Sequence, residues 1–172
     1  MSEKQHTLCF TGHRYYSGSA EELLVRAIEA AFDEGYRVFV SGVAQGFDLA
    51  AAEAVLRFRE RHLGVELLCA VPFRGQARAF SAVDKARYEA VLAAADSVVV
   101  LREDYSFRCY WERDDWMVAH SSRVICWYDG SRGSSGGVGR GAGGGGTRYT
   151  VRAALAAHLD IVNLFSSPDS LF

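Results

Sequence analysis

"RVFVSGVAQGFDLAAAE", residues 37–53, joins a short apolar run to a glycine-containing turn and then to a helical pattern. The run at 37–41 is almost continuously apolar, as in a strand that is covered on both faces of its sheet. Phe47, Ala51 and Val55 then recur at the spacing of one helix face. A buried strand that leads through a glycine turn into a helix is typical of α/β folds.

The same alternation continues along the whole chain. Five further β-type runs occur, at residues 7–11, 65–71, 97–101, 123–128 and 161–164, and helical patterns separate them. Such regular alternation predicts parallel strands joined by right-handed crossovers. We therefore predict an α/β fold with an open, doubly wound and mainly parallel sheet of about six strands, flanked by helices. Residues 1–172 are interpreted as a single domain.

The composition limits the classes of partner. The chain is 49% hydrophobic and 23% charged, with a formal net charge of -2. This balance argues against nucleic acid and anionic membrane as partners, because both usually leave a basic signature. No run reaches the roughly 20 apolar residues that a membrane span needs, and "MSEKQHTLCF" is not a signal peptide, so a cytoplasmic location is expected. The sequence leaves a homodimer open.

Cysteine usage predicts no metal site and no disulfide. Cys9, Cys69, Cys109 and Cys126 are widely spaced, without a CxxC pair or a histidine at ligand spacing. Three of the four lie inside apolar runs, where a reduced thiol behaves as a small core side chain.

In open α/β sheets, ligands bind outside the carboxyl ends of the strands, near the point where the strand order reverses. The segments that follow the predicted strands are therefore candidate sites. These are "GHR" (12–14), "GVAQG" (42–46), "PFRGQ" (72–76), "REDYSFR" (102–108) and "DGSRG" (129–133). All carry polar groups and would converge on one edge of the sheet.

The turn in the opening stretch has the features of an anion site. Gly42 and Gly46 allow a tight turn and allow a phosphate to approach the amides at the start of the next helix. Asp48 in the first helical turn either caps its own helix or accepts hydrogen bonds from a ribose hydroxyl. Arg14, directly after the first strand, is suited to bind a phosphate bidentately.

Two other polar residues receive a structural interpretation. His13 stands beside Arg14 and is a candidate hydrogen-bond donor or base, but a lone histidine is more often a surface residue, which is what we expect. Arg113 is able to reach the same edge, but its segment has the pattern of an amphipathic helix, and we expect Arg113 on the solvated charged face.

Ten of the 17 glycines fall between residues 130 and 146, a composition that cannot bury a core and predicts a flexible loop at 131–144. The tract ends in "GGT" (145–147), immediately before a helical pattern. Its amides and the Thr147 hydroxyl either bind an anion at the positive end of the helix or form an ordinary helix cap.

The motifs "CFTGHR", "SGVAQGFDLAAAE", "AVPFRGQ", "SSRVICWYDG" and "GGTRYTV" together resemble the YpsA-like branch of the SLOG superfamily. They occur in that order along nearly the whole chain. The superfamily is Rossmann-like and is related to the Smf/DprA and LOG proteins. The resemblance implies that a nucleotide derivative such as ADP-ribose or NAD binds at the glycine-rich strand ends, without a metal.

The resemblance and the strand ends together give a set of ligand-binding candidates. The resemblance assigns the pocket to Gly42, Gly46, Asp48, Gly145, Gly146 and Thr147, with Arg14 and Glu53 nearby. The other strand-end candidates are Gly12, Ser41, Pro72, Phe73 and Asp129.

Three functions remain as alternatives. The first is a nucleotide-binding sensor or regulatory protein without catalysis. The second is a LOG-like hydrolase of a nucleotide N-glycosidic bond, in which Glu53 or Asp48 would be the catalytic acid; Thr150 stands where LOG-like enzymes carry a glutamate. The third is a single-stranded DNA-binding module like Smf. Asp114 stands where the YpsA-like branch often has an asparagine, so an amide role at this position is not transferred.

Overall fold

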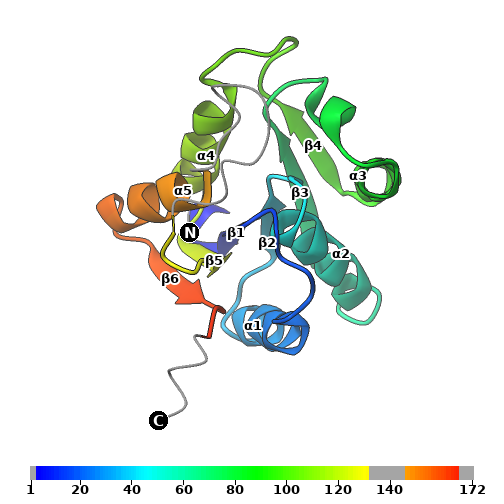
Figure 1. The fold of residues 1–172 in the computed structure, drawn as a ribbon. Helices are drawn as coiled ribbons and strands as arrows, with labels where there is room; N and C mark the ends of the chain where they lie inside the picture. The colour runs from blue at the N-terminus through cyan, green and yellow to red at the C-terminus, as the bar shows by residue number, and fades with distance from the viewer. Residues whose placement is uncertain (1–2, 132–145, 167–172) are drawn as a thin grey trace.

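The computed structural model describes residues 3–131 and 146–166, in which strands and helices alternate (Figure 1). The strands are β1 (Thr7–Gly12), β2 (Val38–Ser41), β3 (Glu66–Val71), β4 (Ser97–Val100), β5 (Arg123–Trp127) and β6 (Asp160–Asn163). The α-helices are α1 (Glu21–Asp33), α2 (Phe47–Arg59), α3 (Ala82–Ala94), α4 (Cys109–Ala119) and α5 (Gly146–Ala156). Short 3-10 helices occupy η1 (Glu3–His6) and η2 (Gln76–Ala79).

The six described strands form one parallel sheet in the order β4-β3-β2-β1-β5-β6. From β1 the chain adds β2, β3 and β4 on one side, and it then crosses back to add β5 and β6 on the other. The strand order therefore reverses between β1 and β5. Right-handed crossovers on either side of such a reversal place their helices on opposite faces of the sheet.

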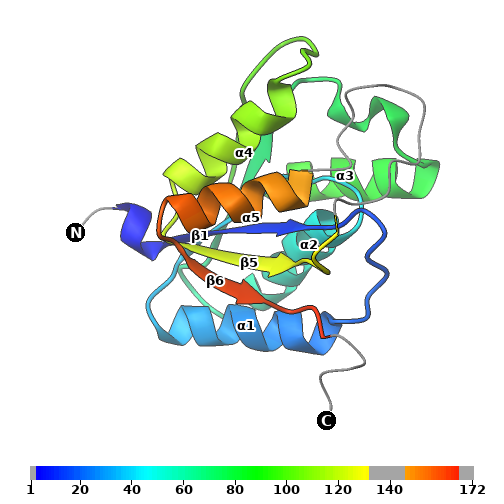
Figure 2. The same cartoon turned by 60° about the vertical axis from the view of Figure 1, so that its left-hand side comes forward.

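The helices follow this rule. Figure 2 shows α4 and α5 side by side on one face of the sheet, with α1 on the other face. The larger hydrophobic core lies under α1, α2 and α3 and includes Leu24, Ile28 and Phe47. The smaller core lies under α4 and α5 and includes Met117 and Val151. Both faces are therefore covered, which explains why the strands are almost continuously apolar.

The predicted fold class is confirmed: the chain has a Rossmann-like α/β fold with a six-stranded parallel sheet. Each predicted strand begins and ends within one residue of the observed strand. All four cysteines are buried as free thiols. Within the described ranges, no helix has the length and apolar character needed to cross a membrane.

Candidate functional site at the carboxyl edge of the sheet

The carboxyl ends of β1 and β5 lie next to each other where the strand order reverses. Gly12, the last residue of β1, pairs in register with Trp127, the last residue of β5. His13 continues this pairing, because its N–H donates to the carbonyl of Trp127 at 3.3 Å. The segments after β1, β2 and β5 and the start of α2 therefore meet at one edge of the sheet, as the sequence predicts.

The turn from β2 into α2 is held by the Ser41 side chain. The Ser41 hydroxyl donates to the backbone carbonyl of Asp48 at 2.8 Å and accepts from the Val43 N–H at 3.1 Å. Val43 is fully buried and has a φ of 47°, a left-handed conformation that is costly for a β-branched residue. Such strain persists only where its surroundings enforce it, and it is concentrated at functional sites.

Gly46 is required by the packing of this turn. Its φ is 84°, and a Cβ atom there would lie 2.4 Å from the carbonyl oxygen of Arg14 and 2.6 Å from that of His13. The first helical N–H, that of Phe47, donates to the same His13 carbonyl at 3.3 Å. Backbone atoms of Arg14 and His13 therefore occupy the space beside Gly46 in which the sequence predicts a phosphate. Contact between a phosphate and this turn stays a prediction.

Arg113 of α4 is buried, with only 5% of its surface exposed, so the prediction of a solvated position was wrong. Its Nη1 donates to the carbonyl of Gly42 at 2.7 Å, and its Nε donates to Asp114 Oδ1 at 2.6 Å. A Cβ atom on Gly42 would lie 2.5 Å from that Nη1. Gly42 is therefore a glycine because the guanidinium packs directly against it. We refer to Gly42, Asp48, Arg113 and Asp114 as the Arg113 cluster.

Two buried carboxylates of the Arg113 cluster have incomplete hydrogen bonding. Asp48 Oδ1 and Asp114 Oδ2 have no hydrogen-bond partner among the residues that the structure describes. Burial raises the pKa of Asp48 to about 7, although Arg113 opposes the shift. Burial also raises the pKa of Asp114, again against the effect of Arg113. Each carboxylate thus has one buried oxygen without a partner in the described residues, and such an oxygen calls for an explanation.

Arg14 lies on the exposed side of this edge. Its guanidinium is 5.8 Å from the ring centre of Tyr110, and the guanidinium of Arg113 is at the same distance from that ring. Tyr110 is half-buried and thus adjoins both the exposed and the buried guanidinium. Arg14 is exposed, and within residues 3–131 and 146–166 it forms no ion pair.

A second group forms between β1 and β5 from His13, Tyr15 and Asp129, which we call the Tyr15 stack. The rings of His13 and Tyr15 are 4.7 Å apart and nearly parallel. Asp129 Oδ2 accepts a hydrogen bond from the Tyr15 hydroxyl. His13 Nε2 accepts from the Asp129 N–H at 3.3 Å and lies 2.8 Å from Asp129 Oδ1. His13 is only 4% exposed, so its predicted surface position was wrong. Burial lowers its pKa in spite of Asp129.

Glu53 points away from the Arg113 cluster. Both of its carboxylate oxygens accept from Arg87 of α3 at 2.8 Å. Arg87 also pairs with Asp84, whose other oxygen accepts from Gln45 of the turn. Glu53 thus joins α2 to α3 on one face of the sheet, whereas Asp48 interacts with α4 on the other. The structure does not bring the two candidate acids together.

The remaining candidates lie around the same edge. Pro72 is buried and Phe73 half-buried after β3, where the Phe73 ring contacts Tyr110 at 6.1 Å. Gly146 begins α5, and its Cβ position would be 3.8 Å from Asp114 Oδ2. Thr147 is buried in the same helical turn. Gly145 and positions 132–144 of the predicted loop lie outside the described residues.

Sequence reasoning did not assign Gln76, which the structure places in this site. Gln76 is buried, and its Nε2 donates to the Gly42 carbonyl at 2.9 Å. That carbonyl therefore accepts from Gln76 and from Arg113. The position of Gln76 inside "PFRGQ", directly after a strand, was the available signal.

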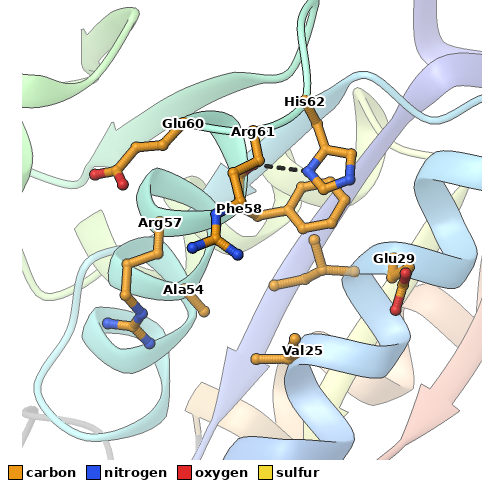
Figure 3. Close-up of a pocket in the computed structure, with 9 residues that line it drawn as sticks. Val25, Glu29, Ala54, Arg57, Phe58, Glu60, Arg61 and His62 are labelled. Carbon is orange, nitrogen blue, oxygen red and sulfur yellow. Dashed lines mark hydrogen bonds between the residues drawn. The ribbon is translucent and has the colours of Figure 1, made fainter.

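A separate groove of about 440 Å³ lies between α1 and the end of α2 (Figure 3). Val25 and Glu29 of α1 line one side, and Arg57, Phe58 and His62 line the other. Phe58 and His62 stack at 3.7 Å, and Arg57 pairs with Glu21. Because the carboxyl end of α2 lies opposite the strand carboxyl ends, this groove is remote from the Arg113 cluster.

The chain is thus a Rossmann-like α/β protein whose polar and aromatic side chains gather where the strand order reverses. No group of three potential metal-ligating side chains is present in the described ranges. The sequence profile of YpsA, the YspA SLOG family, matches residues 8–138. The chain therefore belongs to the SLOG family.

Individual relatives agree with this membership. An uncharacterized SPbeta prophage-derived protein, YoqJ of Bacillus subtilis (strain 168), is 27% identical over 124 residues, which cover 65% of this chain and 72% of YoqJ. DNA processing protein A of Helicobacter pylori, whose structure is described for its single-stranded DNA binding mode, matches with a TM-score of 0.61 at 15% identity.

The match to DNA processing protein A covers 92% of this chain but only 65% of the chain of DNA processing protein A. A structural genomics target, TM1055, matches with a TM-score of 0.53 at 13% identity, over 91% of this chain and 72% of its own. At these identities the two structural similarities show a shared fold only.

Proposed function

We propose that the protein binds a nucleotide derivative, such as ADP-ribose or an NAD-like dinucleotide, at the carboxyl edge of the sheet and acts as a sensor or regulatory protein. The supporting observation is that this edge presents both a cation and carboxylate oxygens. Arg14 offers an exposed cation, and Asp48 and Asp114 retain oxygens without partners in the described residues. A sugar phosphate carries both complementary groups, an anion and hydroxyl donors.

The two parts of the ligand have separate roles in this proposal. The phosphate pairs with Arg14, whose planar guanidinium suits bidentate binding. The ribose hydroxyls donate to the Arg113 cluster, where the free carboxylate oxygens are now buried. Binding therefore requires that the side chains that cover these oxygens move aside.

The experiment is isothermal titration calorimetry with ADP-ribose, NAD and AMP on the wild-type protein, Arg14→Ala and Arg26→Ala. Arg26 is the matched control because it is an exposed arginine on α1 that pairs with Glu22. We expect Arg14→Ala to weaken ADP-ribose binding about tenfold or more, which corresponds to roughly 1.4 kcal/mol. Arg26→Ala should bind as the wild type does. Failure of the wild-type protein to bind any of the three, or equal binding by Arg14→Ala, would contradict the proposal.

We propose binding without hydrolysis of the glycosidic bond. A hydrolase needs an acid or base that can reach the substrate, and both oxygens of Glu53 are engaged by Arg87. Asp48 is buried next to Arg113, and in this proposal it accepts from a ribose hydroxyl, so it does not protonate the leaving base. Incubation with AMP, followed by assay of ribose 5-phosphate, tests this point. Release that Asp48→Asn or Glu53→Gln abolishes in a folded protein would establish an enzyme.

Single-stranded DNA binding is the second candidate. Between β4 and the first turn of α4, the side chains of Tyr105, Phe107 and Trp111 are 53%, 66% and 45% exposed, and Arg108 lies over the Phe107 ring. Exposed aromatic rings with interspersed arginines are suited to stack on bases of a single strand. Titration with an oligothymidylate distinguishes the candidates: salt-sensitive binding that Phe107→Ala abolishes, without ADP-ribose binding, would favour DNA.

A further inference from the structure

The Tyr15 ring combines exposure with an unusually fixed position. It is 44% exposed, yet it stacks on the buried His13 ring with centres 4.7 Å apart and planes 10° apart. Exposed tyrosines usually sample several rotamers, and ordering one costs conformational entropy. A fixed, exposed aromatic ring at a candidate ligand edge therefore calls for a functional explanation.

Asp129 fixes both rings at once. Its Oδ2 accepts from the Tyr15 hydroxyl, its Oδ1 lies 2.8 Å from His13 Nε2, and the Ser131 N–H donates to Oδ1 at 2.9 Å. The carboxylate extends from the end of β5, whereas both rings follow β1. The orientation of Tyr15 is thus set by two strands, before any ligand binds. Such preorganisation reduces the entropy cost of binding.

The ring contacts of Tyr15 distinguish its two faces. Trp127 makes an edge contact with Tyr15 at 5.6 Å and with His13 at 6.0 Å. A ring that covered the Tyr15 face opposite His13 would be about 10 Å from His13, given ordinary aromatic spacings. Trp127 therefore lies beside the stack, and among the described residues no aromatic ring stacks on the second face of Tyr15.

We infer that the second face of Tyr15 is the stacking platform for the nucleobase of the ligand. This inference rests on the proposed function and names the part of the ligand that the Tyr15 stack recognises. The preceding residue is Arg14, so consecutive side chains would bind the base and the phosphate of one nucleotide. The buried His13 ring stacks on the first face of Tyr15 and supports it. The Tyr15 ring is therefore already in place when a base stacks on its second face. Base stacking on an aromatic side chain contributes about 1–3 kcal/mol.

The test compares ADP-ribose binding to wild-type protein, Tyr15→Leu and Tyr15→Phe, with ribose 5-phosphate as a competitor that lacks the base. We expect Tyr15→Leu to weaken ADP-ribose binding about tenfold. Tyr15→Phe keeps the ring and should remain within about threefold of the wild type. The matched control is Tyr36→Leu, because Tyr36 stands before β2 at the amino ends of the strands, where its hydroxyl accepts from Ser122 at 3.1 Å. Ribose 5-phosphate should compete equally weakly in all four proteins.

A second measurement does not depend on whether Tyr15→Leu folds. In the wild-type protein, intermolecular NOEs should connect the adenine protons of ADP-ribose with the ring protons of Tyr15. If ADP-ribose binds without these NOEs, or binds Tyr15→Leu with wild-type affinity, the platform is refuted while the proposed function stands. If wild-type protein binds none of ADP-ribose, NAD and AMP, both are refuted; if it binds only NAD or AMP, that ligand replaces ADP-ribose in both measurements. Binding of an oligothymidylate alone, with NOEs to Tyr15, would assign the platform to single-stranded DNA and refute the nucleotide platform.

Discussion

The Arg113 cluster and the Tyr15 stack lie at the same edge of the sheet, but they differ in what their polar groups do. In the Arg113 cluster, the guanidinium and both carboxylates are at most 5% exposed, and they hold the turn between β2 and α2. In the Tyr15 stack, a buried histidine supports a ring that is 44% exposed. The buried residues of this edge hold the fold, in addition to the contact with ribose hydroxyls that we propose for Asp48 and Asp114, whereas the exposed Tyr15 ring mainly offers a surface to the ligand. Loss of the Arg113 guanidinium should therefore lower stability, and removal of the Tyr15 hydroxyl should leave it nearly unchanged.

The largest effect is expected from Arg113→Met. The variant leaves Asp48 and Asp114 buried without their cation, which costs about 3–5 kcal/mol of unfolding free energy in comparable cases. Urea denaturation at pH 7 measures the loss. The control is Arg108→Met, because Arg108 is exposed at the start of α4 and should change stability by less than about 0.5 kcal/mol. Equal stability of the two variants would show that the buried guanidinium does not hold the turn.

A smaller loss is expected from Gly46→Ala. The added Cβ would meet the backbone of Arg14 and His13 at a φ of 84°, so we expect a loss of about 3 kcal/mol. Gly18→Ala is the matched control, because Gly18 has a φ of 98° and nothing within 4 Å of its Cβ position. It should cost only the conformational strain, about 1 kcal/mol. Similar melting temperatures for both variants would argue that the steric contact at Gly46 is unimportant.

A pH-dependent effect is expected from Asp48→Asn. With its pKa raised to about 7, folded Asp48 keeps a proton between about pH 4 and pH 7 that the unfolded chain has released. Raising the pH through this window therefore lowers the stability of the wild type. The groups that act on Asp48 are Arg113, Asp114 and Arg14, and the variant retains them all.

The measurement is the difference in unfolding free energy between Asp48→Asn and wild type from pH 5 to pH 8. The difference should shift in favour of the variant by about 1 kcal/mol or more as the pH rises. The lowered pKa of His13 acts in the opposite direction below pH 6.5, but it is common to both proteins and cancels. A difference that is constant with pH would show that Asp48 is ionised throughout.

The smallest effect on stability is expected from Tyr15→Phe. It removes a hydrogen bond to Asp129 at an exposed position, where the gain over water is small, so the unfolding free energy should change by less than about 1 kcal/mol. Urea denaturation provides the value. A loss as large as that of Gly46→Ala would mean that the Tyr15 stack is also a structural element, and the comparison of the two regions would fail.

The sequence was sufficient for the fold and for the edge, because apolar periodicity depends on neighbours along the chain. All six strands followed from such runs, and the strand ends converge as predicted. The roles of individual side chains depended on contacts over long sequence separations. The local pattern predicts a solvated position for Arg113. Its partner, the Gly42 carbonyl, lies 71 positions earlier, so the local pattern does not show the contact that buries it. The burial of His13 depends similarly on Trp127 and Asp129.

Glycines illustrate the same limit. The sequence shows that Gly42 and Gly46 occupy a turn, and it permits either a ligand or a protein group beside them. In the structure, the Arg113 guanidinium and the Arg14 carbonyl occupy those places. The nature of a glycine's neighbour is a tertiary property, so local sequence could not separate the two explanations. The ligand-binding roles of the strand-end residues stay a prediction.

The most direct test of nucleotide binding at the carboxyl edge is an NMR titration of ¹⁵N-labelled protein with ADP-ribose. If the nucleotide binds at this edge, the amide signals of Arg14, Tyr15 and Gly42 should shift with a common dissociation constant. Signals from the groove between α1 and α2, such as those of Arg61 and His62, should stay unchanged. Shifts confined to that groove, or no shifts at millimolar ADP-ribose, would contradict the account.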